Sequence, residues 1–274
     1  MEGLEWMTTE VSALRALPIT TGNNFRELGG YQSMNGQHIK YHKVLRSGRL
    51  APLSQQDLTY LDQYGTRFDV DLRSADEVKE APDKVPANAT YKYLPVFNYD
   101  QTQNSLTLQE LENEYQGNPN HGHEHMKLVY HNMIAEPHAK QSYHQFFEIL
   151  LANAKDGAAT LFHCTAGKDR TGMAAVFFMA ALGIDQETIK TDYLLTNKIA
   201  APHINARLNE LKAQHASADT IANIRSLHSV HADYLAAAMA QVKRESGDLN
   251  NYLHEGLQLT DHDLQELRKI YLTD

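Results

Sequence analysis

A polar loop set between two apolar segments most constrains the fold of this chain. Residues 159–162 form a short apolar run with the length of a buried strand, and residues 173–184 form a longer apolar run that fits a helix. Between them, residues 163–172 read His-Cys-Thr-Ala-Gly-Lys-Asp-Arg-Thr-Gly. An apolar strand and an apolar helix must both be covered by other elements, so the pattern favours an α/β layered fold.

The remaining patterns place strands early in the chain and helices late. An Asn35-Gly36 turn predicts a two-residue hairpin with a strand on each side. Capping patterns at Ser54 and Ser74 predict two helix starts, and Gly65 predicts the end of the first helix. Strands are expected at 67–72, 91–96 and 159–162, an amphipathic helix around 143–154, and further helices at 172–182, 186–196, 202–214, 218–226, 232–243 and 261–272.

No repeat or linker divides the chain, so we predict a single domain over residues 1–274. Residues 101–140 are polar, histidine-rich and interrupted by Gly and Pro, and we interpret them as an inserted lid. His121, His123 and His125 within this stretch are interpreted as solvated loop histidines, because zinc signatures have other spacings. No metal and no cofactor is expected.

The composition limits the kinds of molecule that the chain is expected to bind. The formal net charge of −9 argues against nucleic acid, and the hydrophobic and charged fractions of 42% and 22% are those of globular proteins. No apolar run reaches the length of a membrane span, and the acidic start has no signal-peptide pattern. The expected location is cytoplasmic, or secreted if a signal peptide has been removed; the sequence leaves the oligomeric state open.

The loop itself predicts an oxyanion site. A loop that leaves a strand and enters a helix turns backbone N–H groups toward one point, and the helix start adds partial positive charge. Arg170, six residues after Cys164, would bring a two-pronged guanidinium to the same point. Gly167 allows close backbone approach, and Thr171 offers a hydroxyl to the sulfur. Thr165, Ala166, Gly167, Lys168 and Thr171 are therefore the expected substrate-binding residues.

Cys164 is the only cysteine, which excludes an internal disulfide and any multi-cysteine metal site. A thiol near helix N-termini and cations is expected as the thiolate at neutral pH. A thiolate beneath a bound phosphate monoester can attack phosphorus in line, giving a cysteinyl-phosphate that water hydrolyses.

These residues resemble a known family. The pattern His-Cys-x5-Arg-Thr-Gly is similar to the signature of the protein tyrosine phosphatase superfamily, and its Gly-Lys-Asp-Arg form resembles a bacterial branch that includes tyrosine and phosphoinositide phosphatases. Residues 24–30 and 71–74 resemble upstream motifs of that branch. The resemblance implies a central sheet flanked by helices, with Cys164 as nucleophile and Arg170 as phosphate ligand. It also implies that His163 supports the thiolate and that Lys168 favours phosphoinositides as well as phosphotyrosine.

The sequence does not identify the general acid directly, because residues 101–155, which precede Cys164, contain no Asp. Asp169, Asp100 and Asp71 are the candidates, and the same resemblance favours Asp169. Arg73 is interpreted either as a second phosphate anchor or as a salt-bridge partner of Asp71 or Glu77.

The leading hypothesis is a phosphomonoester hydrolase that acts on phosphotyrosine and on phosphoinositides through a cysteinyl-phosphate intermediate. A catalytically silent phospho-binding module is one alternative, although such modules usually lack the cysteine or the arginine. An arsenate reductase or sulfurtransferase is the other, but the arsenate route normally needs further thiols, which this chain lacks.

Overall fold

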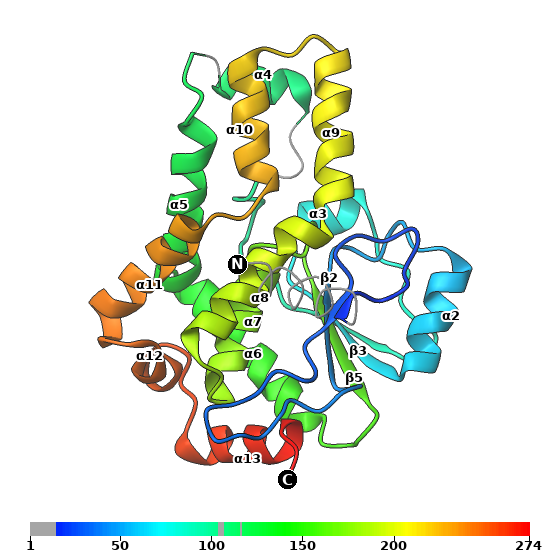
Figure 1. Cartoon of the computed structure of the whole chain (residues 1–274), viewed down its shortest axis with the longest axis vertical. Coiled ribbons are helices and arrows are strands. Elements are labelled where there is room, and N and C mark those ends of the chain that lie inside the picture. The colour runs from blue at the N-terminus through cyan, green and yellow to red at the C-terminus, as the bar shows by residue number, and fades with distance from the viewer. Residues whose placement is uncertain (1–14, 104–106, 116) are drawn as a thin grey trace, which may run out of the picture.

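The computed structural model describes residues 15–103, 107–115 and 117–274. Its centre is a five-stranded sheet in the order β1-β2-β5-β3-β4 (Figure 1). Strands β2, β5, β3 and β4 run parallel, and β1 lies antiparallel on the β2 edge. The strands are β1 Arg26–Glu27, β2 Val44–Ser47, β3 Thr66–Asp71, β4 Thr90–Tyr93 and β5 Ala159–His163. The layered α/β fold predicted from the sequence is confirmed.

Helices cover both faces of this sheet. In Figure 1, α2 lies on one side and α6 and α7 on the other, while α5, α9 and α10 extend beyond the sheet. The helices are α2 Gln55–Tyr64, α3 Ala75–Glu80, α4 Leu108–Tyr115, α5 His121–Ala135, α6 Pro137–Ala152, α7 Arg170–Ala181, α8 Gln186–Ile199, α9 Ala201–Ala213, α10 Ala218–His228, α11 Ala232–Ser246, α12 Leu249–Glu255 and α13 Asp261–Tyr271. The helical C-terminal part is as predicted, with α12 added. In the part of the chain that is described, no helix is long and apolar enough to cross a membrane.

Strand β5 is the middle strand of the sheet, and its side chains pack into the core on both faces. All five of its residues are buried. Leu161 belongs to the cluster under α2, whereas Phe162 belongs to the larger cluster that holds α7. This alternation follows from the two-residue period of a strand. The position of β5 between β2 and β3 places its end in the middle of the sheet edge.

The predicted helix signals at Ser54 and Ser74 are confirmed. Each residue closes a capping box, one at the start of α2 and one at the start of α3. Gly65 ends α2 with a φ of 100°, a conformation that favours glycine.

The prediction of two strands around Asn35-Gly36 is wrong. The turn exists, since Gly36 has a φ of 86° and donates to the Ser33 carbonyl at 2.9 Å. Its arms form no strand in the described residues: they share an isolated bridge between Gln32 and His38 and a few backbone hydrogen bonds, such as that from Ile39 N–H to the Tyr31 carbonyl at 2.8 Å. The neighbouring backbone pairs elsewhere, with Ser33 bridged to Ile184 and Ile39 to Leu272.

Residues 101–140 are more regular than the polar composition suggested, because they contain α4, α5 and the start of α6. The loop interpretation of His121, His123 and His125 is wrong, since all three lie in the first turns of α5. His123 Nε2 lies 2.8 Å from an Asp233 oxygen, and His125 Nε2 lies 2.8 Å from the Gln101 carbonyl. Whether this segment acts as a lid stays a prediction.

Candidate active site

The loop between β5 and α7 lies at the carboxyl edge of the sheet, and residues outside it fix its shape. Gly167 has a φ of 69°, and a Cβ there would lie 2.2 Å from the Ser47 carbonyl oxygen. The Gly167 carbonyl accepts from Asn24 Nδ2 at 2.8 Å and from Arg46 Nη2 at 3.0 Å. The backbone N–H of Arg49 donates to the Thr165 carbonyl at 3.1 Å. Only glycine fits this close contact with β2.

A buried carboxylate holds these outer residues together. Asp192 of α8 accepts from Arg46 Nη1 at 2.7 Å and from Arg26 Nε at 3.3 Å, and both arginines are fully buried. Burial alone would raise the pKa of Asp192, but the charges of Arg26 and Arg46 hold it below its usual value. Arg26 thus acts on the loop through Asp192 and Arg46.

Cys164 follows β5 directly, and its side chain is 1% exposed among the apolar residues of the larger core cluster. Thr171, in the first turn of α7, is also buried, and its hydroxyl has no hydrogen-bond partner among the described residues. The predicted contact of that hydroxyl with the sulfur stays a prediction.

Arg170 is held by a carboxylate from a different element. Its Nη1 and Nη2 atoms donate to the two oxygens of Glu77 in α3 at 2.6 and 2.7 Å, and all these groups are buried. Glu77 also accepts from the Thr165 hydroxyl. Nη2 makes a further bond of 3.2 Å to Thr102 Oγ1. The Nε–H of Arg170 is buried and has no hydrogen-bond partner in the described ranges.

Arg73 takes the structural role rather than that of a phosphate anchor. Its guanidinium donates to both oxygens of Asp71 at 2.9 and 2.7 Å, and to Asp83 at 2.6 Å. The salt bridge expected with Asp71 is therefore present, whereas Glu77, the other expected partner, pairs with Arg170. Asp71, a predicted candidate for the general acid, is thereby held in a buried ion pair.

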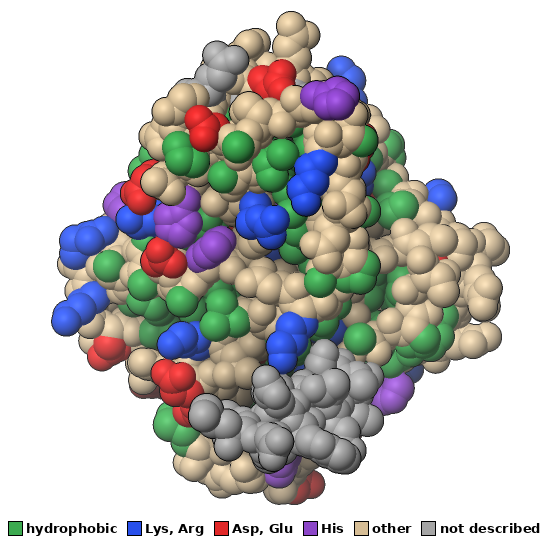
Figure 2. Space-filling view, turned by 45° about the horizontal axis from the view of Figure 1, so that its top comes forward, with side chains coloured by type: hydrophobic (Ala, Val, Ile, Leu, Met, Phe, Trp, Pro, Cys, Tyr) green, Lys and Arg blue, Asp and Glu red, His purple; other side chains and the backbone are tan. Residues whose placement is uncertain are grey.

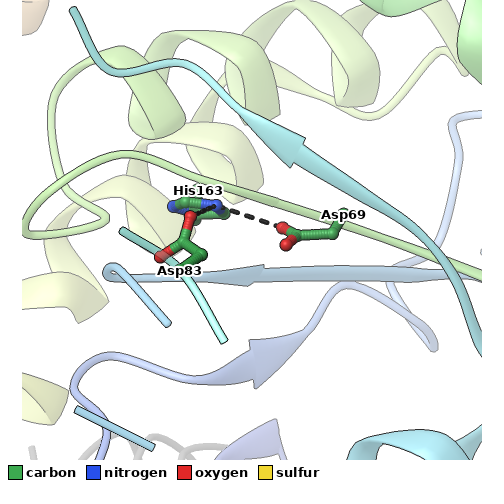
Figure 3. A group of neighbouring side chains, drawn as sticks. All are labelled: Asp69, Asp83 and His163. Atoms are coloured by element: carbon green, nitrogen blue, oxygen red, sulfur yellow. Dashed lines mark ion pairs between the residues drawn. The ribbon is translucent and has the colours of Figure 1, made fainter. Parts of the chain in front are cut away.

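His163 lies in a buried group of charges (Figure 3). Its Nε2 is 3.1 Å from an oxygen of Asp69 and 3.1 Å from an oxygen of Asp83, and its Nδ1 is 3.3 Å from the Cys164 carbonyl. Burial alone would lower the pKa of His163, but Asp71, Asp83 and Asp69 raise it well above its usual value. Against the effect of burial, the His163 charge lowers the pKa of Asp83 to about 2, whereas burial raises the pKa of Asp69, so the imidazole pairs chiefly with Asp83.

The same three side chains, Asp69, Asp83 and His163, are also of the types that bind metal ions, and their ligand atoms lie within 4.8 Å of one another. However, the Asp83 oxygen that faces His163 also accepts from Arg73 at 2.6 Å. A guanidinium already neutralises that oxygen and would repel a metal ion. The donor set fits a protonated histidine better than a metal.

Asp169 lies directly before α7 and is fully buried. Its Oδ2 accepts from Lys168 Nζ at 2.6 Å, and its Oδ1 accepts from the Tyr130 hydroxyl at 2.9 Å. Tyr193 of α8 donates in turn to the Tyr130 oxygen at 2.9 Å. Asp100, another predicted candidate, accepts from Thr102 at 2.6 Å, next to Arg170.

A comparison with known families identifies the kind of site that these residues form. The profile of the tyrosine phosphatase family matches residues 17–273. The chain belongs to the tyrosine phosphatase family. It is accordingly a phosphatase that acts on phosphorylated substrates, as the resemblance of the loop implied.

Three curated proteins are similar to this tyrosine phosphatase over most of their length. A Cupriavidus necator protein named "Putative tyrosine-protein phosphatase H16_A0669" is 30% identical over 93% of this chain and 88% of its own. The "Triple specificity protein phosphatase PtpB" of Mycobacterium tuberculosis is 26% identical over 89% of this chain and 94% of its own. A "Tyrosine-protein phosphatase" of Nostoc commune is 25% identical over 82% of this chain and 72% of its own.

Sequence reasoning missed several residues of this phosphatase site. Glu77 was interpreted as a helix cap and as a possible partner of Arg73, while Asp192, Tyr130 and Tyr193 were not singled out. Their partners lie 39 to 166 residues away along the chain. For Tyr130, the apolar spacing of α5 was an available signal; for the others, only the fold brings the partners together.

Proposed function

We propose that this tyrosine phosphatase hydrolyses phosphotyrosine and phosphoinositide monoesters through a cysteinyl-phosphate on Cys164. The unpartnered Nε–H of Arg170 is the observation that carries the proposal. Glu77 occupies the two terminal nitrogens and fixes the guanidinium plane, which leaves the Nε edge to bind phosphate oxygens. Cys164, at the other end of the same loop, would then lie beneath the phosphorus.

The proposed reaction has two steps. The Cys164 thiolate attacks phosphorus, so that an S–P bond forms while the P–O bond to the leaving group breaks, and Asp169 gives that oxygen its proton. Water then attacks phosphorus, the S–P bond breaks, and Asp169 takes the proton of the water. Arg170 and the loop N–H groups stabilise charge on the three equatorial oxygens in both steps.

The cationic surroundings of the loop support a substrate with more than one phosphate. Burial and the charges of Lys168, Arg207 and His203 lower the pKa of His228 to about 3. Burial and the charges of Arg49 and Arg207 lower the pKa of His203 as well. These side chains come from α9, α10 and the segment after β2. Figure 2 shows Lys, Arg and His side chains on the face over these helices, with Asp and Glu side chains among them.

An inositol ring with several phosphates matches this charge, and the relative named for triple specificity is consistent with more than one substrate class. Lys168 and Arg170 are the Lys and Arg residues of the loop, and Arg170 is already assigned to the reacting phosphate. We therefore assign to Lys168 the contact with an additional phosphate.

Hydrolysis assays with p-nitrophenyl phosphate, phosphotyrosine peptide, phosphoserine peptide and phosphoinositide, all in the presence of a chelator, test the proposal. We expect turnover that vanadate inhibits and that Cys164→Ser abolishes while binding of phosphate esters remains, because a serine hydroxyl stays protonated. Binding without turnover in the wild-type protein would instead identify a phospho-binding module. Turnover of phosphotyrosine alone would remove the phosphoinositide part of the proposal.

A further inference from the structure

Asp169 is held by two donors that differ in what substrate binding does to them. Lys168, on Oδ2, is the neighbouring residue of the loop, and the proposed function assigns it to an additional substrate phosphate. Tyr130, on Oδ1, comes from the middle of α5 and is fully buried. A donor fixed in the core remains on the carboxyl group when Lys168 leaves it.

Tyr130 is itself held in place. Its oxygen accepts from Tyr193 at 2.9 Å, and the two rings meet edge to face with centroids 6.0 Å apart. The Tyr193 hydroxyl has a second, longer acceptor in the His231 carbonyl at 3.3 Å. The Tyr130 proton points to Asp169, because a carboxylate oxygen can only accept it. Burial and the Asp169 charge raise the pKa of Tyr130 well above its usual value, so it remains a donor throughout the pH range of the protein.

We propose that Tyr130 is the positioning residue of the general acid: it fixes Oδ1 of Asp169, so that Oδ2 is oriented to carry the proton to the leaving group. This inference rests on the proposed function and adds α5 and α8 to the catalytic apparatus. Both helices lie outside the signature loop.

Two opposite effects are expected when the Tyr130 hydroxyl is removed. A carboxylate that loses a donor is less stabilised, so the protonated form of Asp169 persists to higher pH. At the same time the carboxyl group loses its fixed orientation, so proton transfer becomes less efficient. A merely structural role would produce neither the shift to higher pH nor a dependence on the leaving group.

The test compares Tyr130→Phe with the wild type on phenyl phosphate, a poor leaving group, and on p-nitrophenyl phosphate, a good one. We expect kcat on phenyl phosphate to fall about 10-fold, part of the 10²–10⁴-fold that a general acid supplies. On p-nitrophenyl phosphate we expect a fall of less than about threefold, with KM nearly unchanged. The alkaline limb of the kcat profile should move up by about one pH unit.

Matched variants complete the experiment. Tyr252→Phe removes a buried hydroxyl that donates to a carbonyl of α5, Ile134, at 2.9 Å, and should leave both rates unchanged. Tyr193→Phe should shift the profile in the same direction as Tyr130→Phe but less, and it decides the question if Tyr130→Phe does not fold. Asp169→Asn sets the largest loss to be expected.

Equal losses on the two substrates, or an unmoved alkaline limb, would overturn the inference. If wild-type turnover depends on Cys164 while Tyr130→Phe behaves like the wild type, the proposed function stands and this inference alone fails. The search for the general acid would then move to Asp100.

Discussion

Replacing Glu77 by Gln removes one charge from the buried pair that orients Arg170. Gln has nearly the same shape, but its amide nitrogen faces a guanidinium that can only donate. Loss of one partner of a buried ion pair typically costs about 3–5 kcal/mol, because the other charge remains buried. We expect the free energy of unfolding at pH 7 to fall by an amount in this range.

The pH dependence gives a second value for the contribution of Glu77 to the free energy of unfolding. Burial alone would raise the pKa of Glu77, but the Arg170 charge and hydrogen bonds from Arg170, Thr165 and Ser74 lower it from 4.5 to about 2. A carboxyl whose pKa falls this far on folding contributes about 3 kcal/mol at neutral pH. Because the pKa is lowered in the folded state, this contribution is complete above pH 4.5 and is lost as the pH falls toward 2.

Urea unfolding followed by circular dichroism at several pH values between 7 and 3 measures this contribution. The difference between wild type and Glu77→Gln should be about 3 kcal/mol at pH 7 and should shrink below pH 4.5. Glu210→Gln is the matched control, since Glu210 pairs with Arg207 at 2.8 Å with a side chain that is 53% exposed. It should cost under about 1 kcal/mol. Equal costs for the two variants, or a Glu77 difference that does not change with pH, would refute the reasoning.

Three further predictions concern the loop. Arg170→Lys should lower kcat and raise KM on phosphotyrosine in steady-state assays, because one ammonium cannot pair with Glu77 and also present a second edge to phosphate; unchanged constants would show that phosphate binds elsewhere. Lys168→Ala should lower kcat/KM on phosphoinositide at least about 10-fold more than on phosphotyrosine, since the lost charge meets only the additional phosphate; equal losses would contradict its assignment. Gly167→Ala should lower the melting temperature and kcat together, because its Cβ would lie 2.2 Å from the Ser47 carbonyl oxygen; wild-type values for both would show that the loop can relax.

The local parts of the structure could be predicted from the sequence, because their causes lie within a few residues. The capping boxes at Ser54 and Ser74 form between residues three apart. The strand, loop and helix around Cys164 follow from two apolar runs and the polar residues between them. The Asp248 cap of α12, which accepts from the Asn251 backbone N–H, is a local signal of the same kind.

Prediction from the sequence failed in two situations. In one, a residue contacts two partners; in the other, the composition of a segment suggests a loop although its apolar residues have helical spacing. Glu77 Oε2 accepts from the Ser74 backbone at 2.9 Å and also from Arg170 at 2.6 Å, and only the first contact is local. In α5, nearby Gly, Pro and His residues suggested a loop. Yet its buried residues Met126, Val129, Tyr130, Met133 and Ile134 have the spacing of a helix face.

The strand order of the sheet has a consequence for the synthesis of the chain. β5 lies between β2 and β3, and it follows them by 112 and 88 residues, counted from the ends of those strands to its start at Ala159. Until the ribosome has released residue 163, β2 and β3 have no common neighbour and expose unpaired edges. The sheet therefore closes late, through contacts between distant residues, which makes folding slow. Cys164 directly follows β5, so the nucleophile reaches its place only when β5 has entered the sheet. A chain truncated before β5 therefore lacks both the complete sheet and the nucleophile.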